Sequence, residues 1–93
     1  MARNKAVEFQ IIQQIVGKNM GAINILCDCA DKGRFDIVEF IRDINKRNAN
    51  DTISPEMIVT MFKEKCDSDI DKFIALIDKQ FKDAKQMRKY FGY

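Results

Sequence analysis

The chain has 93 residues, of which 46% are hydrophobic and 32% are charged. This length allows one core and no second one, so we expect a single helical domain over residues 1–93. The 16 basic and 14 acidic residues leave a net charge of only +2, which excludes a strong global field toward nucleic acid or an anionic membrane. Four glycines and one proline supply too little turn chemistry for many short strands, so the composition predicts an all-α protein.

The first predicted helix covers residues 4–16. Gly17 and Gly21 follow it and weaken any continuation, because glycine costs about 1 kcal/mol relative to alanine inside a helix. The pattern leaves open whether the first two helices are separate or form one kinked rod. Large apolar residues at spacings of three and four predict one buried face, made of Val7, Phe9, Ile11, Ile12, Ile15 and Val16.

The second predicted helix, over residues 20–30, is apolar almost all the way round. Its sequence, MGAINILCDCA, carries a single charge at Asp28. A helix of this kind must be covered on every side, so we expect it at the centre of the fold. Gly33 is the expected C-terminal cap.

The third predicted helix runs from Ile37 to about Lys46. Asp36 and Glu39 form a D-x-x-E capping box in front of it. We also expect a hydrophobic staple that joins Phe35 to Phe40.

The fourth predicted helix begins at Ser54 and Pro55, a side-chain cap followed by a proline at the first helical position. It extends to about Lys65 and is expected to bury Ile58, Met61 and Phe62.

Ser68 is the expected cap of the last helix, which carries acidic residues in its first turn and basic residues in its last turns. About 22 residues at 1.5 Å each would extend about 33 Å, so its C-terminal half is expected to protrude. The predicted architecture is a compact bundle of four to five helices with a long C-terminal helix.

The cysteines do not have the spacing of a metal site. Cys27 and Cys29 would point about 200° apart on a helix, and only Cys66 could join them in a chain without histidine. We interpret all three as reduced structural thiols, which with the absence of an apolar leader indicates a cytoplasmic protein. No run approaches the roughly 18 apolar residues of a membrane span, so none is expected.

The run from Asp67 to Asp71 has the D-x-D-x-D opening of a calcium loop. The sixth and twelfth positions require glycine and glutamate but hold Lys72 and Asp78, so we predict no metal site. Without histidine, and with both serines expected as helix caps, the chain is not expected to be an enzyme or to bind a cofactor.

A helix-turn-helix around Gly33 is disfavoured, because Asp36 and Glu39 would face DNA phosphates at the start of the recognition helix. An alternative function, nucleic-acid binding, would use basic residues of the last helix, namely Lys79, Lys82, Lys85, Arg88 and Lys89.

The last helix carries more large apolar groups than one core-facing stripe can hide, and such residues are enriched in interfaces. We therefore predict a non-enzymatic interaction module, a homodimer that regulates a protein partner. The predicted partner-binding residues are Leu76, Phe81, Lys85, Met87, Arg88, Tyr90 and Phe91.

Small size, helical make-up and free thiols resemble the small cytosolic regulatory proteins of T4-type phages. The stretches IIQQIVGKNMGAINIL and GRFDIVEFIRDINKR resemble the rapid-lysis (lysis-inhibition) accessory family. This resemblance implies a cytoplasmic protein that binds the cytosolic part of a holin and delays lysis. It assigns no individual functional residues.

Overall fold

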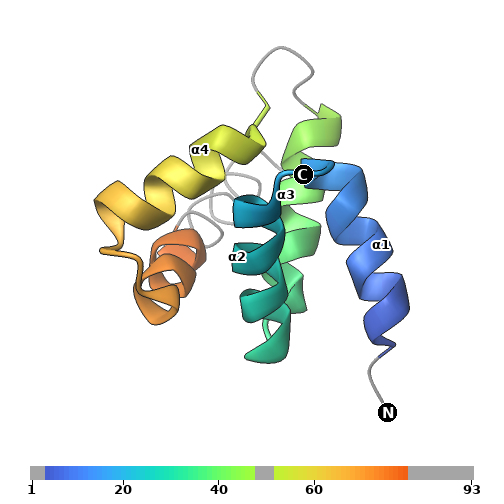
Figure 1. The fold of residues 1–93 in the computed structure, drawn as a ribbon, viewed down its shortest axis with the longest axis horizontal. Helices are drawn as coiled ribbons and strands as arrows, with labels where there is room; N and C mark the ends of the chain where they lie inside the picture. The colour runs from blue at the N-terminus through green and yellow to red at the C-terminus, as the bar shows by residue number, and fades with distance from the viewer. Residues whose placement is uncertain (1–3, 48–51, 80–93) are drawn as a thin grey trace, which may run out of the picture.

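The structure, a computed structural model, describes residues 4–47 and 52–79 (Figure 1). All regular secondary structure in these ranges is helical, which confirms the all-α class. The chain is helical again over residues 70–79, and the expected extension of this last helix beyond residue 79 lies outside the described residues. The other elements are α1 (Lys5–Val16), α2 (Met20–Asp31), α3 (Phe35–Arg47), α4 (Pro55–Thr60) and a π-helical turn, η1 (Met61–Lys65).

Helix α2 lies in the middle of the bundle and contacts α1, α3 and α4 (Figure 1). The prediction of a central second helix is therefore confirmed. Its buried side chains are Ala22, Ile23, Ile25, Leu26, Cys29 and Ala30.

Helices α1 and α2 are separate. Gly17 ends α1 with a positive φ of 61°, a conformation that glycine adopts without a Cβ clash. Asn19 then starts α2, because its side-chain oxygen accepts a hydrogen bond from the Ala22 N–H at 3.1 Å. The turn between the two helices thus has its own cap at each end.

The turn from α2 to α3 is a complete Schellman motif around Gly33, whose φ is 78°. The N–H groups of Gly33 and Arg34 donate to the carbonyl oxygens of Ala30 and Cys29 at 3.0 and 2.9 Å. The Gly33 cap is confirmed. This tight turn leads directly into α3, so α3 begins at Phe35 rather than Ile37.

The early start of α3 makes the predicted capping box and staple wrong. Asp36 lies in the first turn of α3, not before it, and its carboxylate accepts hydrogen bonds from Arg34 Nε and Nη2, each at 3.1 Å. Phe35 is likewise inside the helix and does not precede it.

Ser54 caps α4 as predicted, with its hydroxyl oxygen accepting from the Met57 N–H at 3.1 Å. The helical segment ends at Lys65 as predicted, but from Met61 on the bonding is π-helical, which the sequence pattern did not predict. The wider π turn changes the direction of the side chains that follow. Ile58 is fully buried, whereas Met61 and Phe62 are only half-buried.

The cap of the last helix is Asp69, not Ser68. The Asp69 carboxylate accepts from the N–H of Asp71 at 2.9 Å, while Ser68 has a left-handed φ of 56°. The Ser68 N–H donates to the Phe62 carbonyl oxygen at 2.8 Å. Closure of the π turn in this way moves the start of the next helix along the chain.

Residues 70–79 are attached to the rest of the bundle by packing and by charge. Phe73 is fully buried and meets the Phe62 ring edge-on, with 6.1 Å between the ring centroids. At the other end, Arg34 makes a two-pronged ion pair with the Asp78 carboxylate, in which Nη1 donates to Oδ2 at 2.8 Å and Nη2 donates to Oδ1. These hydrogen bonds raise the pKa of Arg34. The ion pair connects the α2–α3 turn to the last helix.

We predict that Arg34 and Asp78 are energetically coupled. A double-mutant cycle with Arg34→Gln and Asp78→Asn, measured by urea unfolding, is expected to give a coupling free energy of about 1 kcal/mol. Paired hydrogen bonds in partly buried surroundings stabilise a fold more than an exposed ion pair does. The coupling free energy should fall with added salt.

The matched control is the exposed pair Lys72–Asp67, in which Lys72 Nζ lies 3.0 Å from Asp67 Oδ2. We expect almost no coupling free energy for this pair. Equal coupling in the two cycles would contradict a special role for Arg34.

Candidate functional site

The predicted partner-binding residues lie almost entirely beyond residue 79. Leu76 is the exception, and it is partly buried against the hydrophobic core. The remaining six, which stay predictions, lie outside the described residues: Phe81, Lys85, Met87, Arg88, Tyr90 and Phe91.

The described residues show a different exposed apolar surface, on α1. Val7 is 48% exposed and Phe9 is 41% exposed, so the prediction that both belong to the buried face is wrong. Helix α1 packs against α2 and α3 at the edge of the bundle and fully buries only Ile12 and Val16. Since each residue turns a helix by about 100°, Phe9 lies next to this buried line, whereas Val7 lies on the opposite side of α1.

A cavity of about 230 Å³ lies on the Phe9 flank, between α1 and α2. Phe9 and Ile12 contribute its α1 wall, and Cys27 and Ala30 contribute its α2 wall. Lys5, Glu8 and Asp31 also line it, so the cavity combines an apolar wall with charged groups of both signs.

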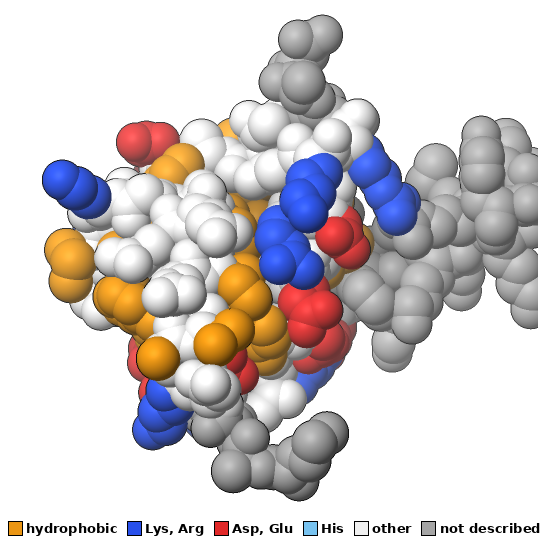
Figure 2. All heavy atoms as spheres, turned by 90° about the vertical axis from the view of Figure 1, so that its right-hand side faces the viewer, with side chains coloured by type: hydrophobic (Ala, Val, Ile, Leu, Met, Phe, Trp, Pro, Cys, Tyr) orange, Lys and Arg blue, Asp and Glu red, His pale blue; other side chains and the backbone are white. Residues whose placement is uncertain are grey.

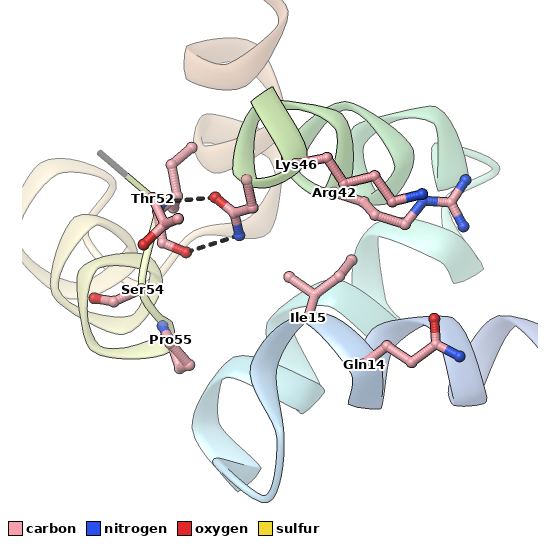
Figure 3. A pocket seen from close by; sticks show the side chains of 9 residues that line it. Gln14, Ile15, Arg42, Lys46, Thr52, Ser54 and Pro55 are labelled. Atoms are coloured by element: carbon pink, nitrogen blue, oxygen red, sulfur yellow. Dashed lines mark hydrogen bonds between the residues drawn. The ribbon is translucent and has the colours of Figure 1, made fainter. Parts of the chain in front are cut away.

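A larger cavity, of about 400 Å³, lies between α1, α3 and the segment that enters α4 (Figure 3). We call it the α1–α3 groove. It combines apolar side chains with amides, hydroxyls and two cations, and its lining residues are Gln14, Ile15, Arg42, Asn45, Lys46, Thr52, Ile53, Ser54 and Pro55.

One wall of the groove is held by Asn45. Its side-chain oxygen accepts from the Ile53 N–H at 2.7 Å, and its amide nitrogen donates to the Ile53 carbonyl oxygen at 3.2 Å (Figure 3). A single side chain thereby satisfies both backbone groups of Ile53, in the way that a neighbouring strand would. Ser54 next to it is fixed as the α4 cap, so this wall is built from hydrogen-bonded groups.

Arg42 and Lys46 supply the positive charge of the groove. They are four residues apart and therefore neighbours on one face of α3, and Figure 3 shows both side chains extending in the same direction, away from Thr52 and Pro55. On the surface formed by α1 and α3, Lys and Arg side chains gather beside Asp and Glu and next to hydrophobic side chains (Figure 2).

No motif in the sequence predicted the groove. The spacing of Arg42 and Lys46 is visible in the sequence, and like charges at this spacing oppose helix formation by a few tenths of a kcal/mol. That spacing was the one local signal for the site. The segment that closes the groove is placed by Asn45 through contacts that follow no sequence period.

None of the three cysteines forms a disulfide bond; Cys27 is half-buried, and Cys29 and Cys66 are buried. Burial, followed by the charge of Asp28, raises the pKa of Cys29 to about 12. Burial, followed by the charge of Asp67, also raises the pKa of Cys66. Both buried cysteines are therefore neutral thiols near neutral pH, with little thiolate to act as nucleophile or metal ligand.

The aspartates of the run 67–71 all have structural partners. Asp67 pairs with Lys72, Asp69 caps the last helix and Asp71 lies 3.4 Å from Lys32 Nζ. Within residues 4–47 and 52–79, no group of three or more cysteine, aspartate or glutamate side chains is placed to hold a metal ion.

Comparisons with protein-family models, with curated proteins and with solved structures found no match to this chain. No helix among the described residues has both the length and the apolar character that crossing a membrane requires.

We predict a large difference in thiol reactivity. In the native protein, iodoacetamide should modify Cys27 first, and Cys29 and Cys66 roughly a hundredfold more slowly, because they react only when the fold opens and exposes a thiol that can ionise. Peptide mass spectrometry over time measures each rate, with urea-unfolded protein as the control. Equal native rates would contradict the buried placement.

Proposed function

We propose that this protein is a non-enzymatic helical module that regulates a protein partner by binding it. The observation that carries the proposal is the apolar surface of α1 at Phe9, which is 41% exposed and lines the cavity between α1 and α2. Large apolar side chains beside concave surfaces are typical of protein interfaces.

The states of the thiols and of the aspartates in the run 67–71 support a binding role. The buried thiols are neutral, and the carboxylates of the run 67–71 cap a helix or pair with lysine. The groups that line the cavities on the α1 side are apolar side chains, amides, hydroxyls and charged groups of both signs.

We further propose that the module forms a homodimer in the cytoplasm. The α1 surface includes apolar groups and charges of both signs, so that two copies related by a twofold axis present matching surfaces to each other. We propose that the predicted partner-binding residues of the last helix, from Leu76 to Phe91, also belong to the interface.

The resemblance to the rapid-lysis accessory family suggests a specific partner. We propose that the partner is the cytosolic part of a holin, and that binding to it delays lysis. This is the most specific form of the proposal, and it depends on the resemblance rather than on a contact in the structure.

The homodimer is tested with the full chain. Phe9→Gln should weaken self-association roughly tenfold, a loss of about 1.4 kcal/mol, because a contact side chain becomes polar. Sedimentation velocity over a range of concentrations measures the dissociation constant.

Met57→Gln is the matched control, since Met57 is 50% exposed on α4 and should leave self-association unchanged. Wild-type protein that stays monomeric at all concentrations would contradict the dimer. The nucleic-acid alternative would be favoured if the chain binds nucleic acid with an affinity that falls steeply as salt rises. Binding of a protein partner with an affinity that does not depend on salt would favour the interaction module.

The holin proposal is tested by the time of lysis. Expression of this chain in bacteria that produce a T4-type holin should delay culture lysis, and Phe9→Gln should shorten the delay while Met57→Gln should not. Lysis at the same time with and without the chain would overturn this form of the proposal.

A further inference from the structure

The α1–α3 groove contains two cations, Arg42 and Lys46, on α3. Among residues 4–47 and 52–79, neither Arg42 nor Lys46 takes part in a salt bridge, whereas Arg34, Lys32 and Lys72 all do. The mutual repulsion of Arg42 and Lys46 is therefore not offset by an acidic group of the groove itself. Both would be stabilised by an incoming negative charge.

Arg42 also carries a buried donor without an acceptor. Its Nε is shielded from solvent and has no hydrogen-bond acceptor among the described residues. A buried N–H without an acceptor is costly, so native proteins rarely leave one unpaired. The guanidinium fork matches a carboxylate in particular, because its parallel N–H groups can donate to both oxygens.

The remainder of the groove fits an apolar group next to that carboxylate. Ile15 and Pro55 are half-buried and line the cavity together with the Ile53 side chain. Figure 3 shows Ile15 extending from α1 toward α3, below the stems of Arg42 and Lys46. At about 400 Å³, the cavity is in the size range of sites for small ligands and side chains.

We propose that the α1–α3 groove binds a carboxylate attached to an apolar body, presented by a protein partner as an acidic residue next to an aliphatic one. Arg42 binds the carboxylate with Lys46 beside it, and Ile15, Ile53 and Pro55 receive the aliphatic part. The assignment to a protein partner rests on the proposed function, whereas the chemistry of the groove rests on its own residues.

The surroundings favour one carboxylate over a nucleic-acid backbone. Phosphate backbones are bound by rows of lysine and arginine, and binding grows with each additional cation. Here Glu39 and Asp43 lie on α3 next to the two cations, both exposed, and Figure 2 shows acidic side chains directly beside basic ones on this face. These acidic groups would repel a polyanion but leave room for one charge at Arg42.

The test uses isocaproate, a small carboxylate with a branched aliphatic body, as the probe. Titration of ¹⁵N-labelled full-length protein should move the Arg42 Nε–H resonance and the backbone resonances of Ile15 and Ile53, saturating in the millimolar range. Isocaproamide has the same shape without the charge and should bind roughly tenfold more weakly, since a charge-assisted hydrogen bond is lost.

Matched variants separate charge from geometry. Arg42→Gln should weaken isocaproate binding roughly tenfold, and Arg42→Lys should restore it only in part because lysine lacks the guanidinium fork. Lys18→Gln removes one positive charge at an exposed position outside the groove and should change nothing. Urea unfolding of each variant checks that the fold is retained.

Several outcomes would overturn the proposal. Equal shifts with isocaproamide, undiminished binding by Arg42→Gln, or no saturable shift at all would each do so. Inorganic phosphate or a short oligodeoxynucleotide binding at the same resonances more tightly than isocaproate would assign the groove to phosphate instead. If isocaproate binds but the chain neither dimerises nor delays lysis, the proposed function fails while the groove chemistry stands.

Discussion

The bundle depends on the burial of one broad face of α2, the helix that contacts α1, α3 and α4. Helix α2 is twelve residues long, and at about 100° per residue its six buried side chains share one broad face of about 160°. The opposite side carries the exposed residues Met20, Asn24, Asp28 and Asp31. The buried face is stable only when neighbours exclude water from it, and α1, α3 and α4 together provide that cover. The absence of a side chain at Gly21 lets α4 approach closely, since a Cβ there would lie 3.2 Å from a Val59 methyl group.

The α2–α3 turn carries this arrangement to the last helix. Gly33 forms a tight turn between α2 and α3, so Arg34 lies immediately before α3. The Arg34 side chain is directed at Asp78. Because Arg34 and Asp78 are 44 residues apart in the chain, their ion pair joins the central turn to the end of the described structure. The backbone conformation of Gly33 and the ion pair of Arg34 therefore together attach the last helix to the α2–α3 turn.

The same arrangement leaves α1 at the edge, and the candidate site follows from this position. A helix covered by α2 and α3 buries one line of side chains and leaves the rest of its surface to solvent, which explains why Val7 and Phe9 are exposed although they are apolar. The α1–α3 groove forms where α1 diverges from the segment that Asn45 holds against α3. The proposed interaction surface is thus a consequence of where the bundle ends.

Local signals in the sequence were sufficient for the helical class, the central position of α2, the Gly33 turn and the Ser54 cap, because each depends on residues within one or two turns of one another. Tertiary structure alone decided which apolar residues of α1 are covered, which carboxylate caps the last helix and where the polar groups of the groove meet. Asp69 replaces Ser68 because a π turn displaces the helix start, and Asn45 reaches Ile53 across a loop. These outcomes depend on contacts between separate elements, and no periodicity along the chain encodes the distance between two helices.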